Sequence, residues 1–239
     1  MKNISEKNIN MAYYLMDRFG LDLEDKEFFW KIAAPIFEHE EFQRRMNDDE
    51  FLHHDTVNLG IHLLSDAIMT YKLAQRKCFD EVTKTRAVII ALFHDLYELP
   101  WQNNKIVKNR LVNSHGFVHP VEVAINVATW YPEYFDNEEE AEIIIDGIMH
   151  HMFPFPVRVL DGSDLELNNK EKFDRLNSNI KSIIINSSNR FKLGAVSICP
   201  SKFKEGRIMS KADKIVSLGK DLKTFNGLIA CLTGHNSNL

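Results

Sequence analysis

Apolar residues recur at helical spacing along most of the chain. Alternating apolar and polar positions, which would indicate half-buried strands, are nearly absent, and one candidate strand pair joins residues 157–160 to residues 195–198. Turn-forming residues such as Pro100, Pro132 and Gly162 separate the apolar segments. The pattern predicts an all-α fold, with helices over Ile9–Phe19, Phe28–Phe42, Ile61–Ala74, Val82–Leu99, Pro120–Trp130, Glu138–Met152, Glu171–Ile185 and Met209–Phe225.

The composition is that of a folded globular chain. Of its 239 residues, 44% are hydrophobic and 26% are charged, which excludes a disordered or low-complexity protein. A net charge of −5 gives no strong nucleic-acid signal. The longest apolar run, residues 87–93, is far shorter than the roughly 20 residues that span a bilayer, and residues 1–16 lack a signal-peptide pattern. We therefore expect a cytoplasmic protein that has no membrane segment.

Among residue types that bind metal ions, histidine is clustered in this sequence and cysteine is not. Cys78, Cys199 and Cys231 are widely spaced and odd in number, which argues against a disulfide framework or a thiolate zinc site. Most of the histidines, in contrast, fall between residues 53 and 151. Imidazole groups that share buried helix faces would be suited to binding a metal ion.

The predicted helix 82–99 places polar side chains on its apolar face. His94 follows Ile90 by four residues and Ala91 by three, so it continues the stripe that faces the core. Asp95 comes next, and Glu98 would lie one helical turn after His94. Burying these groups without partners would cost several kcal/mol, whereas a metal ion would turn them into ligands. The alternative is a helix end at which the carboxylates are solvated.

The same placement recurs in other segments. His151 continues a stripe that includes Ile148, while His150 falls nearer the edge of that face, so we favour His151 as the ligand. His62 and Asp213 also lie beside apolar stripes. Each of these segments offers a nitrogen or oxygen ligand suited to iron, manganese, zinc or cobalt.

Taken together, these residues form an ordered pattern. The segments His62-Leu-Leu-Ser, Ala91-Leu-Phe-His-Asp, His115-Gly-Phe-Val-His-Pro, His151-Met-Phe-Pro and Ala212-Asp-Lys-Ile resemble the H…HD…H…H…D signature of HD-domain metal-dependent phosphohydrolases. The resemblance covers residues 36–218 and implies an HD-domain helical bundle over residues 51–220. An N-terminal helical extension over residues 1–50 would precede this domain, and a C-terminal helix end and tail over residues 221–239 would follow it.

The resemblance also implies a dinuclear metal site. Its ligands would be His62, His94, Asp95 and Asp213 for a first ion and His119 and His151 for a second ion, with Asp95 bridging the two. The cofactors would be two divalent ions drawn from iron, manganese, cobalt and zinc, with magnesium as a further candidate. Two such ions would activate a water molecule and clamp the phosphoryl group of a small phosphorylated substrate, such as a nucleotide.

Two further residues are candidates for catalysis. Glu98 matches the last position of the H-D-x-x-E arrangement in HD-type nucleotidases, where the carboxylate orients water or transfers a proton. Lys214, beside Asp213, could supply positive charge to the phosphate. Lys84, Arg86 and the basic residues of the loop 105–110 are alternatives for that charge.

The ligand pattern leaves three functions open. A phosphohydrolase is the first, and a mixed-valence di-iron oxygenase of the same fold, acting on a small polar substrate, is the second. A catalytically silent regulatory module is the third, although such a module has no need for so many buried polar groups. The sequence also leaves open whether the chain forms a homo-oligomer.

Overall fold

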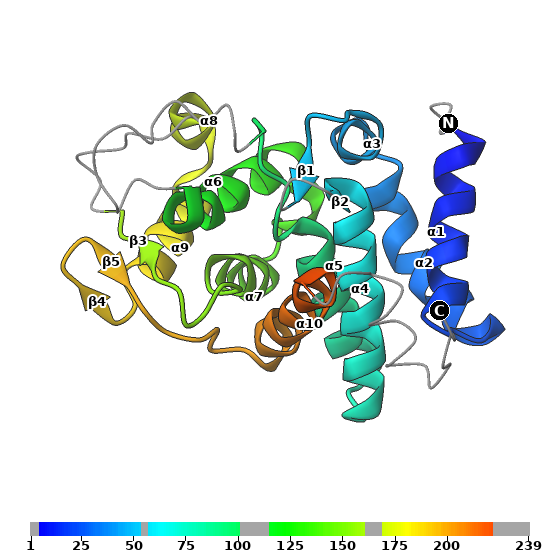
Figure 1. The fold of residues 1–239 in the computed structure, drawn as a ribbon. Coiled ribbons are helices and arrows are strands. Elements are labelled where there is room, and N and C mark those ends of the chain that lie inside the picture. Colours follow the sequence, from blue (N-terminus) through cyan, green and yellow to red (C-terminus); the bar gives the residue numbers. More distant parts are fainter. Residues whose placement is uncertain (1–4, 54–56, 101–114, 161–168, 222–239) are drawn as a thin grey trace.

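The structure is a computed structural model that describes residues 5–53, 57–100, 115–160 and 169–221. Helices account for most of this part of the chain, as the periodicity predicts (Figure 1). The helices are α1 (Glu6–Arg18), α2 (Leu23–Phe37), α3 (Glu40–Asn47), α4 (Leu59–Arg76), α5 (Glu81–Phe93), α6 (His115–Trp130), the 3₁₀ helix η4 (Pro132–Tyr134), α7 (Glu138–Met149), α8 (Lys170–Arg175), α9 (Ser178–Ser188) and α10 (Lys204–Asp221). The strands are β1 (Leu52–His53), β2 (Val57–Asn58), β3 (Val157–Arg158), β4 (Lys192–Leu193) and β5 (Val196–Ser197).

Side-chain caps fix where many of the helices begin. A polar residue directly before the first turn accepts a hydrogen bond from a backbone N–H that has no partner within the helix. In α4 this residue is Asn58, which accepts from the Ile61 amide at 3.2 Å. In α5 it is Asp80, which accepts from the Thr83 amide at 2.8 Å. Ser5, Asp22, His39, Asn137 and Asn177 cap α1, α2, α3, α7 and α9 in the same way.

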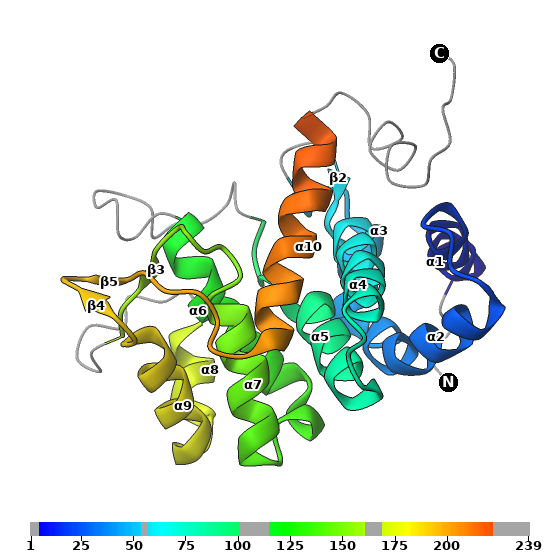
Figure 2. The ribbon, with the colours of Figure 1, turned by 90° about the horizontal axis from the view of Figure 1, so that it is seen from below.

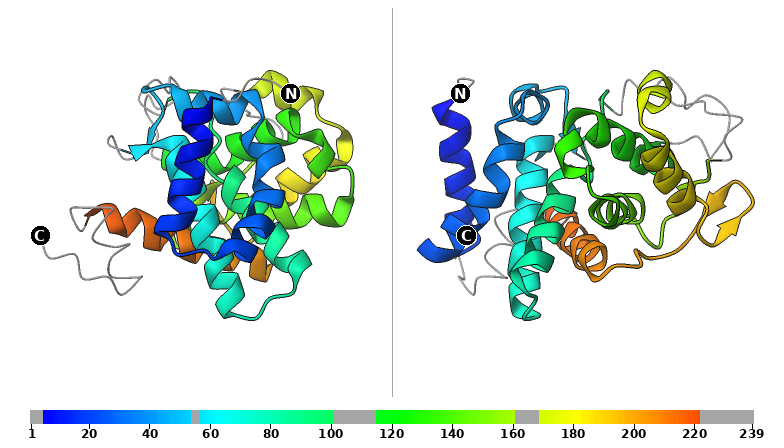
Figure 3. Two further views of the ribbon diagram at one scale, coloured as in Figure 1. Left: turned by 90° about the vertical axis from the view of Figure 1, so that its right-hand side faces the viewer. Right: turned by 180° about the vertical axis from the view of Figure 1, so that it is seen from behind.

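The helices form a bundle in which α10 has a central position. It packs against α4, α5 and α7, and α4 and α5 pack along each other (Figure 2). Helices α1 and α2 lie at one end of the molecule, whereas α8, α9 and the strands β3, β4 and β5 lie at the opposite end (Figure 3). One apolar core runs through the bundle and includes residues of α1 and α2. None of the described helices is long and apolar enough to cross a membrane.

The predicted strand pair is present within a larger sheet. Strand β3 pairs antiparallel with β5, and Val157 lies opposite Ser197. Strand β4 adds to the other edge of β5, which gives the order β3-β5-β4. A second small antiparallel sheet, β1 with β2, was not expected from the sequence.

The prediction of one helix over residues 82–99 is wrong, because α5 ends at Phe93. Side chains from other parts of the bundle bind the carbonyl groups that follow. Arg45 donates to the Tyr97 carbonyl at 2.6 Å, and Asn126 donates to the Leu96 carbonyl at 3.3 Å. These hydrogen bonds take the place of helical ones, so the chain leaves the helix near His94.

Other helix boundaries also differ from the periodic pattern. The predicted helices 28–42 and 171–185 are each divided in two, because His39 and Asn177 cap new helices inside them. Helix α6 includes His115, five residues before the predicted start at Pro120. Pro120 therefore lies inside α6 and does not mark its start.

Candidate metal centre

The structure brings the six predicted ligands to one place in the bundle. His62 comes from α4, His94 caps α5 and Asp95 follows it. The other three are His119 of α6, His151 just after α7, and Asp213 of α10. All six side chains are buried, and the most accessible, Asp95 and Asp213, are 7% exposed. Residues that are far apart in the sequence therefore form one polar cluster inside an apolar core.

Asp95 lies at the centre of this cluster. Its Oδ1 is 3.3 Å from Nε2 of His119 and 3.5 Å from Nε2 of His151. Its Oδ2 faces the other way, 3.7 Å from Nε2 of His94 and 3.8 Å from Nε2 of His62. Each oxygen of one carboxylate thus faces its own pair of imidazoles. A carboxylate that bridges two metal ions has this arrangement.

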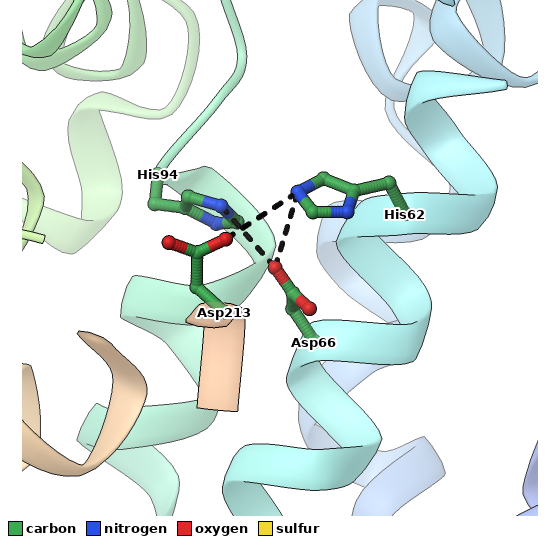
Figure 4. Close-up of side chains that lie close together, drawn as sticks. All are labelled: His62, Asp66, His94 and Asp213. Atoms are coloured by element: carbon green, nitrogen blue, oxygen red, sulfur yellow. Dashed lines mark ion pairs between the residues drawn. The ribbon is translucent and has the colours of Figure 1, made fainter. Parts of the chain in front are cut away.

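The side of the cluster that Asp95 Oδ2 faces contains a further aspartate, Asp66, that the sequence analysis missed. Asp66, on α4, lies between His62 and His94, with its Oδ2 3.1 Å from Nε2 of His62 and 3.3 Å from Nε2 of His94 (Figure 4). Asp213 approaches from α10, its Oδ1 3.9 Å from Nε2 of His62. One ligand atom from each of these four residues lies within 4.8 Å of the others.

Asp66 had a signal in the sequence. It follows His62 by four residues, so the two side chains share one face of the helix. The helix is otherwise largely apolar and is buried over most of its length, so an aspartate at that position needs a polar or charged partner. The resemblance directs attention to the histidine alone, which is why the second residue was not singled out.

Backbone carbonyl groups orient three of the imidazoles. Nδ1 of each ring contacts a carbonyl oxygen within the same turn of chain, which leaves Nε2 facing the cluster. The contacts are His94 to Ala91 at 2.8 Å, His119 to His115 at 2.9 Å and His151 to Ile148 at 2.7 Å. If Nδ1 is the protonated nitrogen, Nε2 presents a lone pair, as metal ligation requires.

The charges in the cluster are strongly coupled. Burial alone would raise the pKa of Asp95, but His94, His119 and His151 around it hold that pKa well below its usual range. Burial, with Asp213 and Asp95 close by, raises the pKa of Asp66 well above its usual range. Burial also raises the pKa of Asp213. The protein thus holds three carboxyl groups together in its interior, where a bound cation would stabilise their charged forms.

The residues present fit a divalent metal ion. Among the described residues, both carboxylate oxygens of Asp66 and Nε2 of His94 are buried without a hydrogen bond. Oδ2 of Asp66 and Nε2 of His94 form an ion pair of 3.3 Å, but buried polar groups without hydrogen bonds are still held at the expense of stability. Imidazole nitrogen and carboxylate oxygen suit manganese, iron, cobalt and zinc, and the carboxylates also suit magnesium.

The neighbouring histidines have different environments. His150 faces away from the cluster, with Nε2 3.2 Å from the Ser187 carbonyl and Nδ1 3.6 Å from Sγ of Cys199. His115 stacks on His119, with ring centroids 4.8 Å apart. The choice of His151 and His119 as the residues that face Asp95 therefore agrees with the structure.

His53 joins the outer side of the cluster. Its ring stacks on that of His62 at a centroid distance of 3.6 Å, and its Nε2 is 3.8 Å from Oδ2 of Asp95. Its side chain is 15% exposed, more than the ligands beneath it. His54, its neighbour in the sequence, lies outside the described residues.

The prediction that Glu98 lies on the same helix as His94, from which its catalytic role was inferred, is wrong. Because α5 ends at Phe93, Glu98 is not one helical turn after His94. Its carboxylate instead forms an ion pair of 2.8 Å with Lys172 on α8. Glu98 therefore has no part in the chemistry proposed below.

The candidate cations have other contacts in the structure. The Lys214 ammonium donates to Ser210 Oγ at 2.6 Å and to the His151 carbonyl at 3.3 Å, so it holds the chain beside a predicted ligand. Its contact with phosphate stays a prediction. Arg86 is paired with Glu140, and the loop 105–110 lies outside the described residues.

Comparisons of the chain with models of known protein families, with curated proteins and with solved structures give no significant match. The functional interpretation therefore depends on the geometry of the cluster and on the residues that form it.

Proposed function

We propose that the protein is a metal-dependent phosphohydrolase that acts on a small phosphorylated molecule, with a nucleotide as the first candidate. The observation that supports this proposal is the position of Asp95. Its two oxygens face two separate groups of buried imidazoles, at 3.3–3.5 Å on one side and 3.7–3.8 Å on the other. This arrangement suits two neighbouring ions, and paired ions are well suited to phosphoester hydrolysis.

In this proposal His62, His94 and Asp213 hold one ion, His119 and His151 hold the other, and Asp95 contacts both. Bound divalent ions supply a water of lowered pKa and stabilise the charge that develops on the phosphoryl oxygens. The protein contributes the orientation of the ligands. The contacts of Nδ1 in His94, His119 and His151 keep the imidazoles aligned, so little reorganisation is needed when metal and substrate bind.

The proposal also accounts for the low exposure of the cluster. In a site with little water, electrostatic interactions between bound ions and a phosphate are much stronger than in bulk solvent. The side chain of His53 is 15% exposed, more than those of His62 and Asp95 that it contacts, so in this proposal it lies on the side that a substrate would meet first. A small phosphorylated molecule, rather than a macromolecule, suits a centre this deeply buried.

The test is phosphate release by protein loaded with Mn²⁺. A panel of nucleotides and other phosphomonoesters would be assayed both in air and under argon. We expect inorganic phosphate from at least one substrate, independently of oxygen, and loss of this activity in His62→Ala, Asp95→Ala and Asp213→Ala. His39→Asn, which changes a histidine outside the cluster to a residue that can still cap α3, is the matched control and should keep wild-type activity.

Two outcomes would contradict the proposal. If Fe²⁺-loaded protein consumes oxygen and neither the Fe²⁺-loaded nor the Mn²⁺-loaded protein releases phosphate, the centre is an oxygenase. If it binds metal and turns over nothing in either atmosphere, a regulatory role follows.

A further inference from the structure

Asp66 lies inside the candidate metal centre although the signature that identified the other residues does not include it. It is completely buried, and it lies together with His62, His94 and Asp213 (Figure 4). If Asp66 is not a ligand, the first ion depends on the shared Asp95. If Asp66 is a ligand, the first ion has a complete set of its own ligands.

The contacts of Asp66 favour direct ligation over a hydrogen-bonding role. Oδ2 lies 3.1 Å from Nε2 of His62 and 3.3 Å from Nε2 of His94. These are the same nitrogens that face Asp95. Despite the short distances, neither oxygen of Asp66 makes a hydrogen bond with any of the described residues. Oδ2 of Asp66 instead lies at ion-pair distance from both nitrogens. An oxygen and two nitrogens that converge in this way suit ligation of one ion.

The position of Asp66 on α4 also supports this role. It follows His62 by one helical turn, so a single helix presents an imidazole and a carboxylate to the same point. Paired ligands at this spacing on a helix are a recurrent way of holding a metal ion. The remaining two ligands come from α5 and α10, which both pack on α4.

We propose that Asp66 is a direct ligand of the first metal ion, which is then held by His62, Asp66, His94 and Asp213. This inference deepens the proposed function and rests on the presence of that metal centre. With four ligands of its own, the first ion binds without help from the second. Two terminal carboxylates, in addition to Asp95, make this half of the centre richer in oxygen and better suited to Mn²⁺ or Fe²⁺ than the half formed by His119 and His151.

The test measures Mn²⁺ binding to metal-free protein by titration calorimetry, with no assay of turnover. In Asp66→Asn we expect the affinity for one of two Mn²⁺ ions to fall by about 100-fold or more, beyond the roughly 10–100-fold that outer residues contribute. In His119→Ala the other ion should be lost and the first retained. Asp80→Asn is the matched control, because it changes an exposed aspartate to a residue that caps a helix equally well, and its binding should equal that of the wild type.

A second variant tests ligation directly and remains useful if Asp66→Asn does not fold. Asp66→Cys loaded with Co²⁺ should show a thiolate-to-cobalt charge-transfer band that the Co²⁺-loaded wild type lacks. Cobalt bound without this band, or wild-type Mn²⁺ affinity in Asp66→Asn, would overturn the role of Asp66. The role of Asp66 and the proposed function can fail independently of each other. If the wild-type protein releases no phosphate but its Mn²⁺ binding depends on Asp66, the phosphohydrolase function is contradicted and the role of Asp66 as a ligand stands.

Discussion

Replacing Gly206 by alanine tests how closely the helix that holds Asp213 must approach its neighbour. Gly206 is near the start of α10, and a Cβ atom added there would lie 2.7 Å from the Cα atom of Gly147 on α7. It would also lie 2.4 Å from Oγ of Ser201. Ordinary van der Waals contact begins at 3.4 Å, and the obstacle on α7 is backbone, so the two helices must move apart.

The expected cost follows from two opposing effects. Overpacking of this kind destabilises a protein by about 1–3 kcal/mol. Alanine is better than glycine inside a helix by about 1 kcal/mol, which offsets part of the cost. We therefore expect a net loss of up to about 2 kcal/mol, which for a chain of this size lowers Tm by roughly 4–8 °C at most. Because Asp213 lies two turns further along α10, the same displacement should weaken metal binding.

The assay compares thermal unfolding of metal-free and Mn²⁺-loaded protein. Gly116→Ala is the control, because a Cβ atom at Gly116 would meet none of the described residues within 4 Å, and its Tm should equal or slightly exceed that of the wild type. In Gly206→Ala we expect a lower Tm without metal and a smaller increase when Mn²⁺ is added. If Gly206→Ala has the Tm and the metal-induced increase of the wild type, the close contact of α7 and α10 does not position Asp213.

Three further predictions concern residues outside the centre. Glu98→Gln should keep turnover close to that of the wild type, because the carboxylate pairs with Lys172; a fall of about 100-fold would restore a catalytic role. Arg190→Met removes the ion pair of the buried Asp146 carboxylate and should lower the free energy of unfolding by about 1–3 kcal/mol. The loss is measured as a lower urea midpoint at an unchanged m value, and an unaltered midpoint would show that the pair adds no stability. Hydrogen bonds from the first turn of α5 lower the pKa of Asp80 to about 2, so Asp80→Ala should lower Tm at neutral pH. The difference in Tm between the variant and the wild type should shrink as the pH falls from 3.8 towards 2, and a pH-independent difference would contradict this.

The buried faces of the helices could be predicted from the sequence because they depend on local periodicity. His94 and His151 continue apolar stripes, and the structure buries both. That five separate segments meet at one cluster does not follow from periodicity, since each helix is consistent with many packings. The expectation that they meet came from the resemblance, and in the structure His62, His119 and Asp213 lie in one cluster.

The features that sequence analysis missed depend on contacts between distant residues. Helix α5 ends where Arg45 binds the Tyr97 carbonyl, a contact between residues far apart in the chain, and no local pattern predicts it. Asp66 is a different case, because its spacing from His62 was visible. An isolated aspartate at that spacing becomes informative only when the burial of both residues and the approach of His94 are known.

The most direct test of the candidate metal centre is the number of Mn²⁺ ions that the metal-free protein binds, measured for the wild type and for Asp95→Ala. Because Asp95 faces both groups of imidazoles, we expect two ions per chain in the wild type. In Asp95→Ala the ion held by His119 and His151 should be lost, whereas the ion held by His62, Asp66, His94 and Asp213 should remain. A wild-type protein that binds no Mn²⁺, or a variant that binds two ions with wild-type affinity, would contradict a dinuclear centre bridged by Asp95.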